Sequence, residues 1–414
     1  MTLAHVVGSP DSVLLRTKLK LIERRRKLKA FTLVLPLLLF IAIVFILPIG
    51  RMILNAVHDD TLLRLMPRTM AALNIWDGRG LPDEAAYAAL ANDLKEAWDQ
   101  KTASEIGRRI NYELPGATSQ VTSSARKARE LSIGPYKTAL IEINPLWGRH
   151  DLWTLLKRGA SAYTAYYLLR SMDLQFGSDG EIVPTPEDKA IFRDAFIRTL
   201  SISLGVTVAT LLLGYPVAYL LATLPARSSN LLMIMVVLPF WTSVLVRTTA
   251  WVVLLQRNGL VNEALMNLHV ISQPAELIFN RFGTMVAMTH IQLPFTILPI
   301  YSVMKTISPN YVRAARSLGA GPFYAFWKVY FPQTLPGVAA GCLLTFILCL
   351  GYYITPALVG GPADQMVSYF VAHYLNEELN WGMASALGAI LLATTLLLYY
   401  VFNKLVGVER IKMG

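Results

Sequence analysis

Long apolar stretches alternate with polar segments along this chain of 414 residues. A helix needs roughly 20 consecutive apolar residues to cross the hydrocarbon core of a bilayer. Six stretches reach about that length, at positions 31–50, 200–223, 231–255, 284–304, 337–358 and 383–405. The pattern predicts an all-α integral membrane protein with six transmembrane helices.

Segment 58–193, between the first and second predicted spans, has the spacing of a separate helical domain. Tyr87, Leu90, Leu94 and Trp98 recur as on one face of an amphipathic helix, and Pro82-Asp83-Glu84 is typical of a helix start. We also expect helices at 103–113, 124–132 and 152–169, a mobile stretch at 115–124, and a helix capped by Thr185-Pro186-Glu187-Asp188 that leads into the second span. Such a domain is either a docking platform or lid, or an insertion that only packs on the transmembrane helices.

Composition supports the membrane assignment, and charge orients it. The chain is 54% hydrophobic and 16% charged, against about 25% charged residues in soluble domains. Basic residues gather at positions 16–29. Because basic residues beside spans stay in the cytoplasm, the N-terminus is expected inside. Six crossings then place the C-terminus and loop 306–334 inside as well, and the insertion outside.

Four regions follow from this pattern. They are a basic cytoplasmic segment (1–30), the first transmembrane helix (31–57), the outer helical insertion (58–193) and a five-helix core (194–414) that contains loop 306–334. The first span is too long for the core of a signal peptide and is expected to remain as an anchor. Leu15, Leu19 and Ile22 share a helical face among cations, which favours contact with anionic lipid over nucleic acid.

Motifs of the common enzyme classes are missing from the sequence. There is no Walker A motif, no HExxH pair and no nucleophile elbow. The six histidines show no metal-ligand spacing. Cys342 and Cys349, seven residues apart in one predicted span, do not suggest a disulfide framework. We therefore expect neither catalysis nor a metal or cofactor bound by this chain.

Residues 311–337 form a basic, Ala-rich segment interrupted by Gly319 and followed by Pro332 and Pro336. With Ala314-Ala315 and with Gly319 three residues after Arg316, the segment resembles the EAA loop of ABC importer permeases. Arg313 stands where that motif usually has glutamate. The resemblance implies a cytoplasmic helix–turn–helix that docks on an ATP-binding subunit. The residues it assigns to this contact are Arg313, Ala314, Ala315, Leu318, Gly319 and Pro322.

Stretches 238–265, 290–301 and 351–362 narrow the resemblance to the spermidine/putrescine branch of type I ABC importers. This branch implies a permease subunit in a bacterial inner membrane, paired with a second, related permease subunit as a heterodimer. Two ATP-binding subunits would carry ATP and Mg²⁺, and a periplasmic binding protein would deliver the solute. The implied cargo is a polyamine or a related amine or amino-acid-like compound.

Aromatic and hydroxyl side chains near prolines within the spans are candidates for the pathway, since proline is tolerated where helices bend or line a cavity. The candidates are Trp241, Thr242, Ser243, Arg247, Tyr352, Tyr353 and Thr355. A charge at membrane depth is costly, so Arg247 is either a pathway or gate residue, or a snorkelling or ion-paired residue at a helix end.

The acids of the core are placed poorly for a polycationic cargo. Glu263, Asp364, Glu377 and Glu378 all fall in predicted outer loops. Either the partner permease supplies a carboxylate, or the binding protein alone selects the cargo, or the cargo is not a polycation. The competing class is an ATP-independent secondary transporter or channel, which usually has inverted repeats and intramembrane ionisable residues. A third class is a membrane receptor that uses the external domain.

Overall fold

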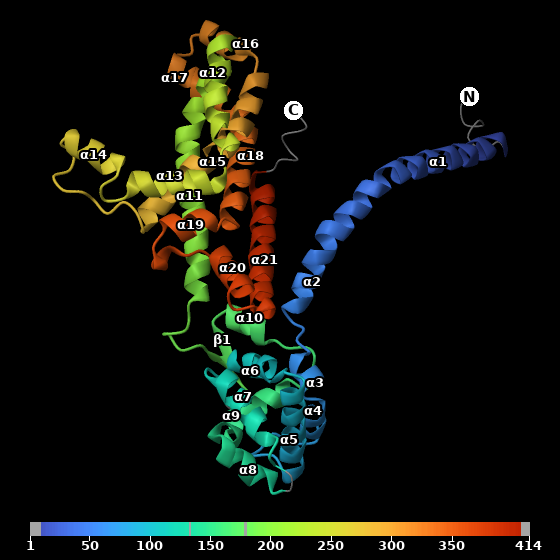
Figure 1. Cartoon of the computed structure of the whole chain (residues 1–414). Helices are drawn as coiled ribbons and strands as arrows, with labels where there is room; N and C mark the ends of the chain where they lie inside the picture. Colours follow the sequence, from blue (N-terminus) through green and yellow to red (C-terminus); the bar gives the residue numbers. More distant parts are fainter. Residues whose placement is uncertain (1–9, 132–133, 178–179, 407–414) are drawn as a thin grey trace. The chain divides into compact units, whose positions relative to one another are not determined.

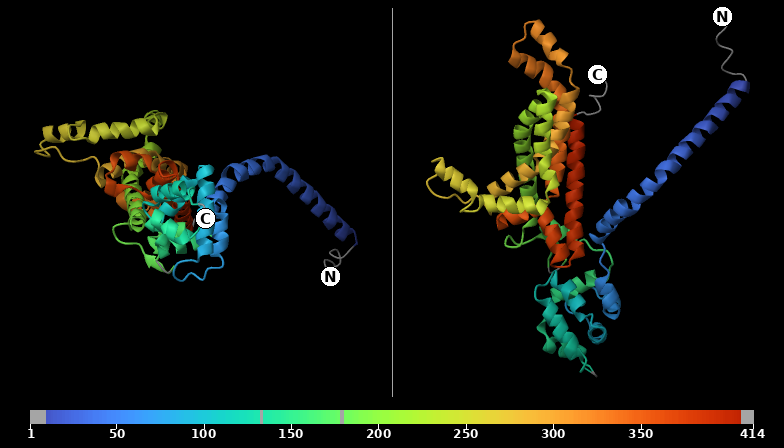
Figure 2. Two further views of the ribbon diagram at one scale, coloured as in Figure 1. Left: turned by 60° about the horizontal axis from the view of Figure 1, so that its bottom comes forward. Right: turned by 45° about the horizontal axis from the view of Figure 1, so that its top comes forward.

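The computed structural model describes residues 10–131, 134–177 and 180–406 and is shown in Figures 1 and 2. It divides into two compact units, Met1–Leu54 and Asn55–Gly414. The first unit is a continuous helix, basic in its first half and apolar in its second, made of α1 (Pro10–Ile41), a π-helical turn (Ala42–Ile46) and α2 (Leu47–Asn55). Its side chains from position 22 onward are almost all exposed, which is the surface that a transmembrane helix offers to lipid.

Helices dominate the described ranges and confirm the all-α membrane class. Among the described residues, five helices are long and apolar enough to cross a membrane: Ile22–Asn55, Phe192–Thr223, Arg281–Thr306, Pro322–Leu350 and Trp381–Lys404. A sixth span requires the pair Ala226–Trp241 and Val244–Asn267, which is bent by 99°. In both Figure 1 and Figure 2 the second half of this pair runs across the direction of the other core helices.

The helices of the insertion are shown in Figure 1, and they pack around a hydrophobic core of their own. Trp147, Trp153 and Tyr87 are fully buried at its centre. Their polar atoms are paired: Tyr87 Oη donates to the Trp147 carbonyl (2.7 Å), Trp147 Nε1 to Ser124 Oγ (2.9 Å) and Trp153 Nε1 to the Trp147 carbonyl (2.9 Å). The helices are α3 (Thr61–Leu65), α4 (Pro67–Leu73), α5 (Glu84–Asp99), α6 (Ala103–Asn111), α7 (Ala117–Ala128), α8 (Tyr136–Ile143), the 3₁₀ turn η2 (Pro145–Gly148) and α9 (His150–Arg158).

The predicted start of α5 is confirmed, because Asp83 Oδ1 accepts from the Ala86 backbone N–H (3.1 Å). Three other local predictions are wrong. Stretch 115–124, expected to be mobile, is largely helical because α7 begins at Ala117. The helix expected at 152–169 is two helices, α9 and α10 (Tyr166–Ser171), separated by a turn that begins at Gly159.

The third wrong prediction concerns the helix that leads into the second span. Residues 185–188 do not cap it, because α11 (Phe192–Thr223) begins only at Phe192. The cap comes from Asp173, whose carboxylate accepts from the backbone N–H groups of Ile191, Phe192 and Arg193 at 3.1, 3.2 and 2.7 Å. Between α10 and α11 lies an antiparallel hairpin of β1 (Leu174–Phe176) and β2 (Ile182–Pro184), with Gln175 opposite Val183.

The core continues after α11 with helices of very different length. In chain order they are α12 (Ala226–Val237), the 3₁₀ turn η3 (Leu238–Trp241), α13 (Val244–Leu255), α14 (Leu260–Asn267), α15 (Arg281–Thr306), α16 (Pro309–Ser317), α17 (Pro322–Ala325), the π-helical turn η4 (Phe326–Tyr330), α18 (Phe331–Leu350), α19 (Ile354–Val359), the 3₁₀ turn η5 (Pro362–Asp364), α20 (Val367–Asn376) and α21 (Trp381–Val406).

Two spans that the hydropathy pattern predicts as continuous helices are interrupted. The span at 231–255 breaks after η3, because Pro239 lacks a backbone N–H and Ser243 starts a new helix by accepting from the Val246 N–H (3.2 Å). The span at 337–358 is instead the helix Pro322–Leu350, and α19 follows as a separate short helix. Non-helical backbone at membrane depth is tolerated where it is buried in protein or lines a cavity.

Small and hydroxyl side chains hold α11, α15 and α18 together. Thr296 Oγ1 donates to Thr210 Oγ1 (2.9 Å) and lies 2.6 Å from Thr345 Oγ1, and all three threonines are buried. A Cβ on Gly341 would lie 2.7 Å from the Thr296 carbonyl oxygen, and one on Gly337 would lie 2.9 Å from Val303 Cβ. Since lipid provides no hydrophobic drive between helices, close approach and interhelical hydrogen bonds are what holds them.

Candidate functional site

Loop 306–334 is a helix–turn–helix in the structure. Ser308 caps α16 by accepting from the Asn310 N–H (3.3 Å), and α16 ends at Ser317. Gly319 follows with a φ of +90°, a conformation that residues with a Cβ rarely adopt. Nothing lies within 4 Å of a Cβ placed on Gly319. Glycine is therefore required by the turn itself and not by crowding within this chain.

The loop carries an exposed apolar surface between basic residues. Leu318 is 90% exposed and Phe323 is 78% exposed. All six predicted coupling residues lie on this loop: Arg313, Ala314, Leu318, Gly319 and Pro322 are exposed, and Ala315 is half-buried. Arg313 forms no ion pair with any described residue. Exposed apolar side chains grouped in this way are typical of a protein-binding surface.

An aromatic cluster fixes the loop to the second span. The Phe326 ring lies 5.9 Å from the Tyr219 ring and 6.4 Å from the Tyr215 ring, and the Tyr330 ring lies 5.6 Å from Tyr219. Tyr215 Oη is also hydrogen-bonded to Thr334 Oγ1 at 3.2 Å. A movement of α16 and α17 would therefore also displace α11 and α18.

The predicted pathway residues lie at the two helix breaks. Trp241, Thr242 and Ser243 are at the junction of η3 and α13, and Tyr352, Tyr353 and Thr355 are at the junction of α18 and α19. The structure brings the two junctions together, because α13 packs on α19 and Thr248 Oγ1 is 3.0 Å from Thr355 Oγ1. Trp241 is 80% exposed and Tyr353 is 41% exposed.

Arg247 and Tyr352 meet where the breaks adjoin. Arg247 Nε and Nη1 are buried without a hydrogen-bond partner among the described residues. Arg247 also interacts electrostatically with Tyr352 and with His290. A buried polar group left unpaired costs about 1–3 kcal/mol, and a charged one costs more. Such groups are expected to face a pathway or another subunit, and the ion pair considered for Arg247 does not form within the described ranges.

Three residues of this junction were not predicted as site residues: Thr248, Trp251 and His290. Trp251 Nε1 donates to His290 Nδ1 (3.2 Å). Trp251 follows Arg247 by one helical turn on α13, so the i, i+4 spacing could have placed both on one face. No spacing rule relates His290, on α15, to that face.

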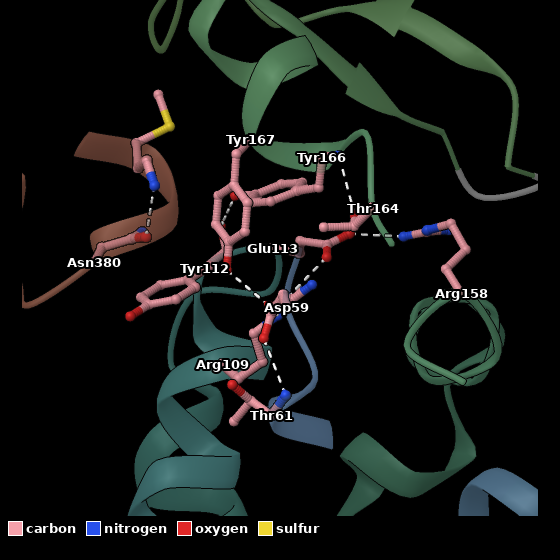
Figure 3. A network of polar contacts seen from close by, with 11 residues as sticks. Asp59, Thr61, Arg109, Tyr112, Glu113, Arg158, Thr164, Tyr166, Tyr167 and Asn380 are labelled. Atoms are coloured by element: carbon pink, nitrogen blue, oxygen red, sulfur yellow. Dashed lines mark hydrogen bonds and ion pairs between the residues drawn. The ribbon is translucent and has the colours of Figure 1, made fainter. Parts of the chain in front are cut away.

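Figure 3 shows a charged network at the base of the insertion, none of whose pairings was predicted. Arg109, on α6, donates through Nε to Asp59 and through Nη1 to Glu113 Oε1 (3.0 Å). Arg158 donates to Glu113 Oε2 (2.7 Å), and Tyr167 Oη donates to Asp59 Oδ2 (2.7 Å). Arg109 is only 6% exposed. Asp59 and Arg109 are 50 positions apart, so sequence spacing does not indicate their contact.

The network keeps its charges when buried. Burial alone raises the pKa of Asp59, but the Arg109 charge and hydrogen bonds from Thr61 and Tyr167 together outweigh it and leave that pKa below its usual value. Burial lowers the pKa of Arg109, and the neighbouring Tyr167, Glu113 and Asp59 more than compensate, so that pKa is raised. In the described part of the chain, no group of three or more His, Cys, Asp or Glu side chains is placed to hold a metal ion.

The family match falls within the core. Residues 201–408 match the family described as "Binding-protein-dependent transport system inner membrane component". The chain is similar to the spermidine/putrescine transport system permease protein PotB of Haemophilus influenzae, with 33% identity over 213 residues, 51% of this chain and 74% of that protein. For PotB of Escherichia coli the identity is 31% over 226 residues, 53% of this chain and 82% of that protein.

A further relative is the inner membrane ABC transporter permease protein YdcU of Escherichia coli, 31% identical over 230 residues that cover 52% of this chain and 72% of that protein. The part matched by the family, 201–408, contains the helix–turn–helix of loop 306–334 and both helix breaks. Half of the chain matches the family model, and relatives above 30% identity are covered over most of their length. The chain therefore belongs to the family of binding-protein-dependent transport system inner membrane components.

Proposed function

We propose that this inner-membrane permease subunit forms, with a second and related permease subunit, the pathway of an ATP-driven importer for a polyamine or a related small amine. Two separate ATP-binding subunits would bind ATP and Mg²⁺ and dock on α16 and α17. A periplasmic binding protein would deliver the solute to the outer face. The observation that carries the proposal is the exposed apolar surface of the helix–turn–helix, with Leu318 90% exposed.

The cargo is proposed from the printed names of the PotB relatives. The outer acids of the core are largely engaged within the chain. Asp364 pairs with Arg281 (3.2 Å), and Glu377 and Glu378 contact His373 at 3.0 and 3.4 Å. The cluster at the helix breaks offers Arg247 and aromatic side chains instead. This arrangement supports selection of the cargo by the binding protein, with the permease accepting what is delivered.

The function is tested by co-expressing the chain with the second permease, the ATP-binding subunit and the binding protein of the same transport system. Proteoliposomes containing the complex should take up labelled spermidine or putrescine only under two conditions. ATP must be on the side of the membrane that carries the ATP-binding subunits, and the binding protein must be on the opposite side. Uptake that survives ATP removal and collapses with an ion gradient would instead identify a secondary transporter. Binding without flux would identify a receptor.

The docking role of the loop is tested by Leu318→Asp. A carboxylate at the centre of an apolar contact loses the burial of the leucine, which is worth about 1.5–3 kcal/mol, so co-purification with the ATP-binding subunit should fall at least about tenfold. The matched control is Leu268→Asp, at a leucine that is 72% exposed and lies outside the loop. Normal co-purification of the Leu318 variant, or equal loss in both variants, would contradict the docking role.

A further inference from the structure

An open groove of about 600 Å³ lies where the insertion meets the start of α21. Its less exposed lining belongs to the network of Figure 3: Arg109 and Tyr167 are buried, and Asp59 is half-buried. Its exposed lining comes from α6, from the segments before α3 and α6, from the turn before α21 and from the first residue of α21: Asp60, Lys101, Arg108, Leu379 and Trp381. The groove is thus shared between the insertion and the last span.

The floor of this groove is fixed on both sides. The backbone N–H of Asp59 donates to Ala162 (2.8 Å) and that of Thr164 donates to Val57 (2.8 Å), so the two ends of the insertion are held together. The Tyr167 ring lies directly on α21: a Cβ on Gly382 would come within 2.7 Å of Tyr167 Cδ2 and nearer still to Cε2 and Cζ. A partner bound to the insertion side of the groove would therefore also act on α21.

The exposed lining has the chemistry of a protein contact. Trp381 is 59% exposed and Leu379 is 52% exposed. Asp60, Lys101 and Arg108 form no ion pair within the described ranges. Tryptophan and arginine contribute a large share of the binding energy at protein interfaces, so these residues are suited to a partner that brings both an apolar contact and ionic pairs.

The charge balance separates a protein partner from an anionic lipid. The lining contains three acids, Asp59, Asp60 and Glu105, and three bases, Lys101, Arg108 and Arg109, so its formal charge is zero with histidine neutral. A phosphate headgroup would be favoured by an excess of cations, whereas a protein loop carrying both signs can be complementary to a mixed lining. The observations favour a folded protein.

We propose that this groove is the docking site of the periplasmic solute-binding protein. A loop of the binding protein would pack on Trp381 and form ion pairs with Asp60, Lys101 and Arg108. The inference rests on the proposed function for the existence of that partner. Two observations support this location. The insertion lies outside the family match at 201–408, and the groove is lined by residues of both the insertion and the start of α21. A partner seated here touches the insertion and α21 together.

The test reverses two charges of the groove in the full complex. In nanodiscs of phosphatidylcholine, the double variant Lys101→Glu/Arg108→Glu should weaken binding of the solute-loaded binding protein about tenfold or more, as loss of close charge pairs does at other interfaces. Its stimulation of ATP hydrolysis should fall in parallel at subsaturating binding protein. The matched control is Arg126→Glu/Lys127→Glu, which makes the same charge change at exposed residues of α7 that do not line this groove. The control should bind within about twofold of wild type, as surface charges away from a contact do.

Unchanged affinity of the groove variant overturns the inference, and so does an equal loss in the groove and control variants. A difference that appears only when phosphatidylglycerol is added would identify a lipid site and overturn it as well. Trp381→Ala gives a second measurement without a charge change and should also weaken binding. Failure of the proposed function is distinguishable, because it would appear as absent ATP-dependent uptake by the wild-type complex.

Discussion

The insertion and the transmembrane core are both helical, but they are held together by different residues. The insertion buries Trp147, Trp153 and Tyr87, which is how a domain in water gains stability, since apolar area removed from water drives its folding. The core instead brings α15 and α18 together at Gly341 and joins Thr296 to Thr345. Its outer surface remains apolar because lipid is its solvent. The same secondary structure thus follows two packing rules in one chain.

Buried charge shows a second difference between the two regions. Arg109 in the insertion is surrounded by Asp59 and Glu113, and its hydrogen bonds are made within the domain. Arg247 in the core has two buried nitrogen atoms with no partner among the described residues. A satisfied buried charge fixes architecture, whereas an unsatisfied one is expected at a site that something else completes. The comparison therefore supports a structural role for Arg109, and a pathway role for Arg247 stays a prediction.

The largest expected effect comes from breaking the core of the insertion. Trp147→Ala removes a fully buried side chain, and such truncations cost about 3–5 kcal/mol. The insertion should become sensitive to limited proteolysis in detergent while the spans remain protected. Trp241→Ala is the matched control, since this tryptophan of the core is 80% exposed. Equal resistance of the Trp147 variant and wild type would contradict an independently packed insertion.

A smaller effect is expected from adding one methyl group between two spans. Gly341→Ala places a Cβ 2.7 Å from the Thr296 carbonyl oxygen, so α15 and α18 must separate, at a cost of about 1–3 kcal/mol for overpacking. The thermal unfolding temperature of the purified chain should fall, with no change in proteolysis of the insertion. Gly351→Ala serves as the control because no atom lies within 4 Å of its added Cβ. Equal unfolding temperatures for the two variants would show that the close helix contact does not limit stability.

Local signals in the sequence predicted local structure in some places and failed at 115–124, 152–169 and 185–188. The Asp83 cap of α5 and the turn at Gly319 both depend on residues within a few positions of one another. The hydropathy pattern also located five apolar spans among the described residues, and the sixth is the pair bent by 99°. The exact break at Ser243 was missed because a hydropathy window averages over a polar residue inside an apolar run, although Pro239 and Ser243 together are a local signal of a new helix start.

Long-range polar contacts could not be predicted from this one sequence. The Tyr167–Asp59 hydrogen bond joins residues 108 positions apart, and Tyr167 is one of 18 tyrosines. Its position depends on how α10 returns to the start of the insertion, which periodicity does not specify. The neighbourhood of Arg247 is similar, because His290 reaches it only through the packing of α13 on α15. The candidate pathway residues were thus chosen by residue type, and only the fold shows which of them lie together.

The smallest expected effect is a pH dependence that distinguishes two buried carboxylates of the insertion. The pKa of Asp59 is lowered in the folded chain, as described above. Burial raises the pKa of Asp93, and the hydrogen bonds from Thr69 and the charge of Arg68 do not overcome that effect. Asp93 Oδ2 accepts from both the backbone N–H and the hydroxyl of Thr69, each at 2.7 Å. The two acids therefore depart from the ordinary pKa in opposite directions.

Their contributions to stability have opposite signs on acidification. Asp59 contributes stability above the unfolded-state pKa of about 3.9, and this contribution is lost as the pH falls through its lower folded pKa. Asp93 opposes folding once the pH rises through its raised pKa, so protonation on the acid side restores stability. Relative to wild type, Asp59→Asn should flatten the acid loss of insertion stability, and Asp93→Asn should steepen it. The measurement is thermal unfolding of the full chain, followed by tryptophan fluorescence, between about pH 7 and 3, a window that spans the ordinary carboxylate pKa. If both variants changed the pH dependence of the unfolding temperature in the same direction, the opposite pKa shifts of Asp59 and Asp93 would be contradicted.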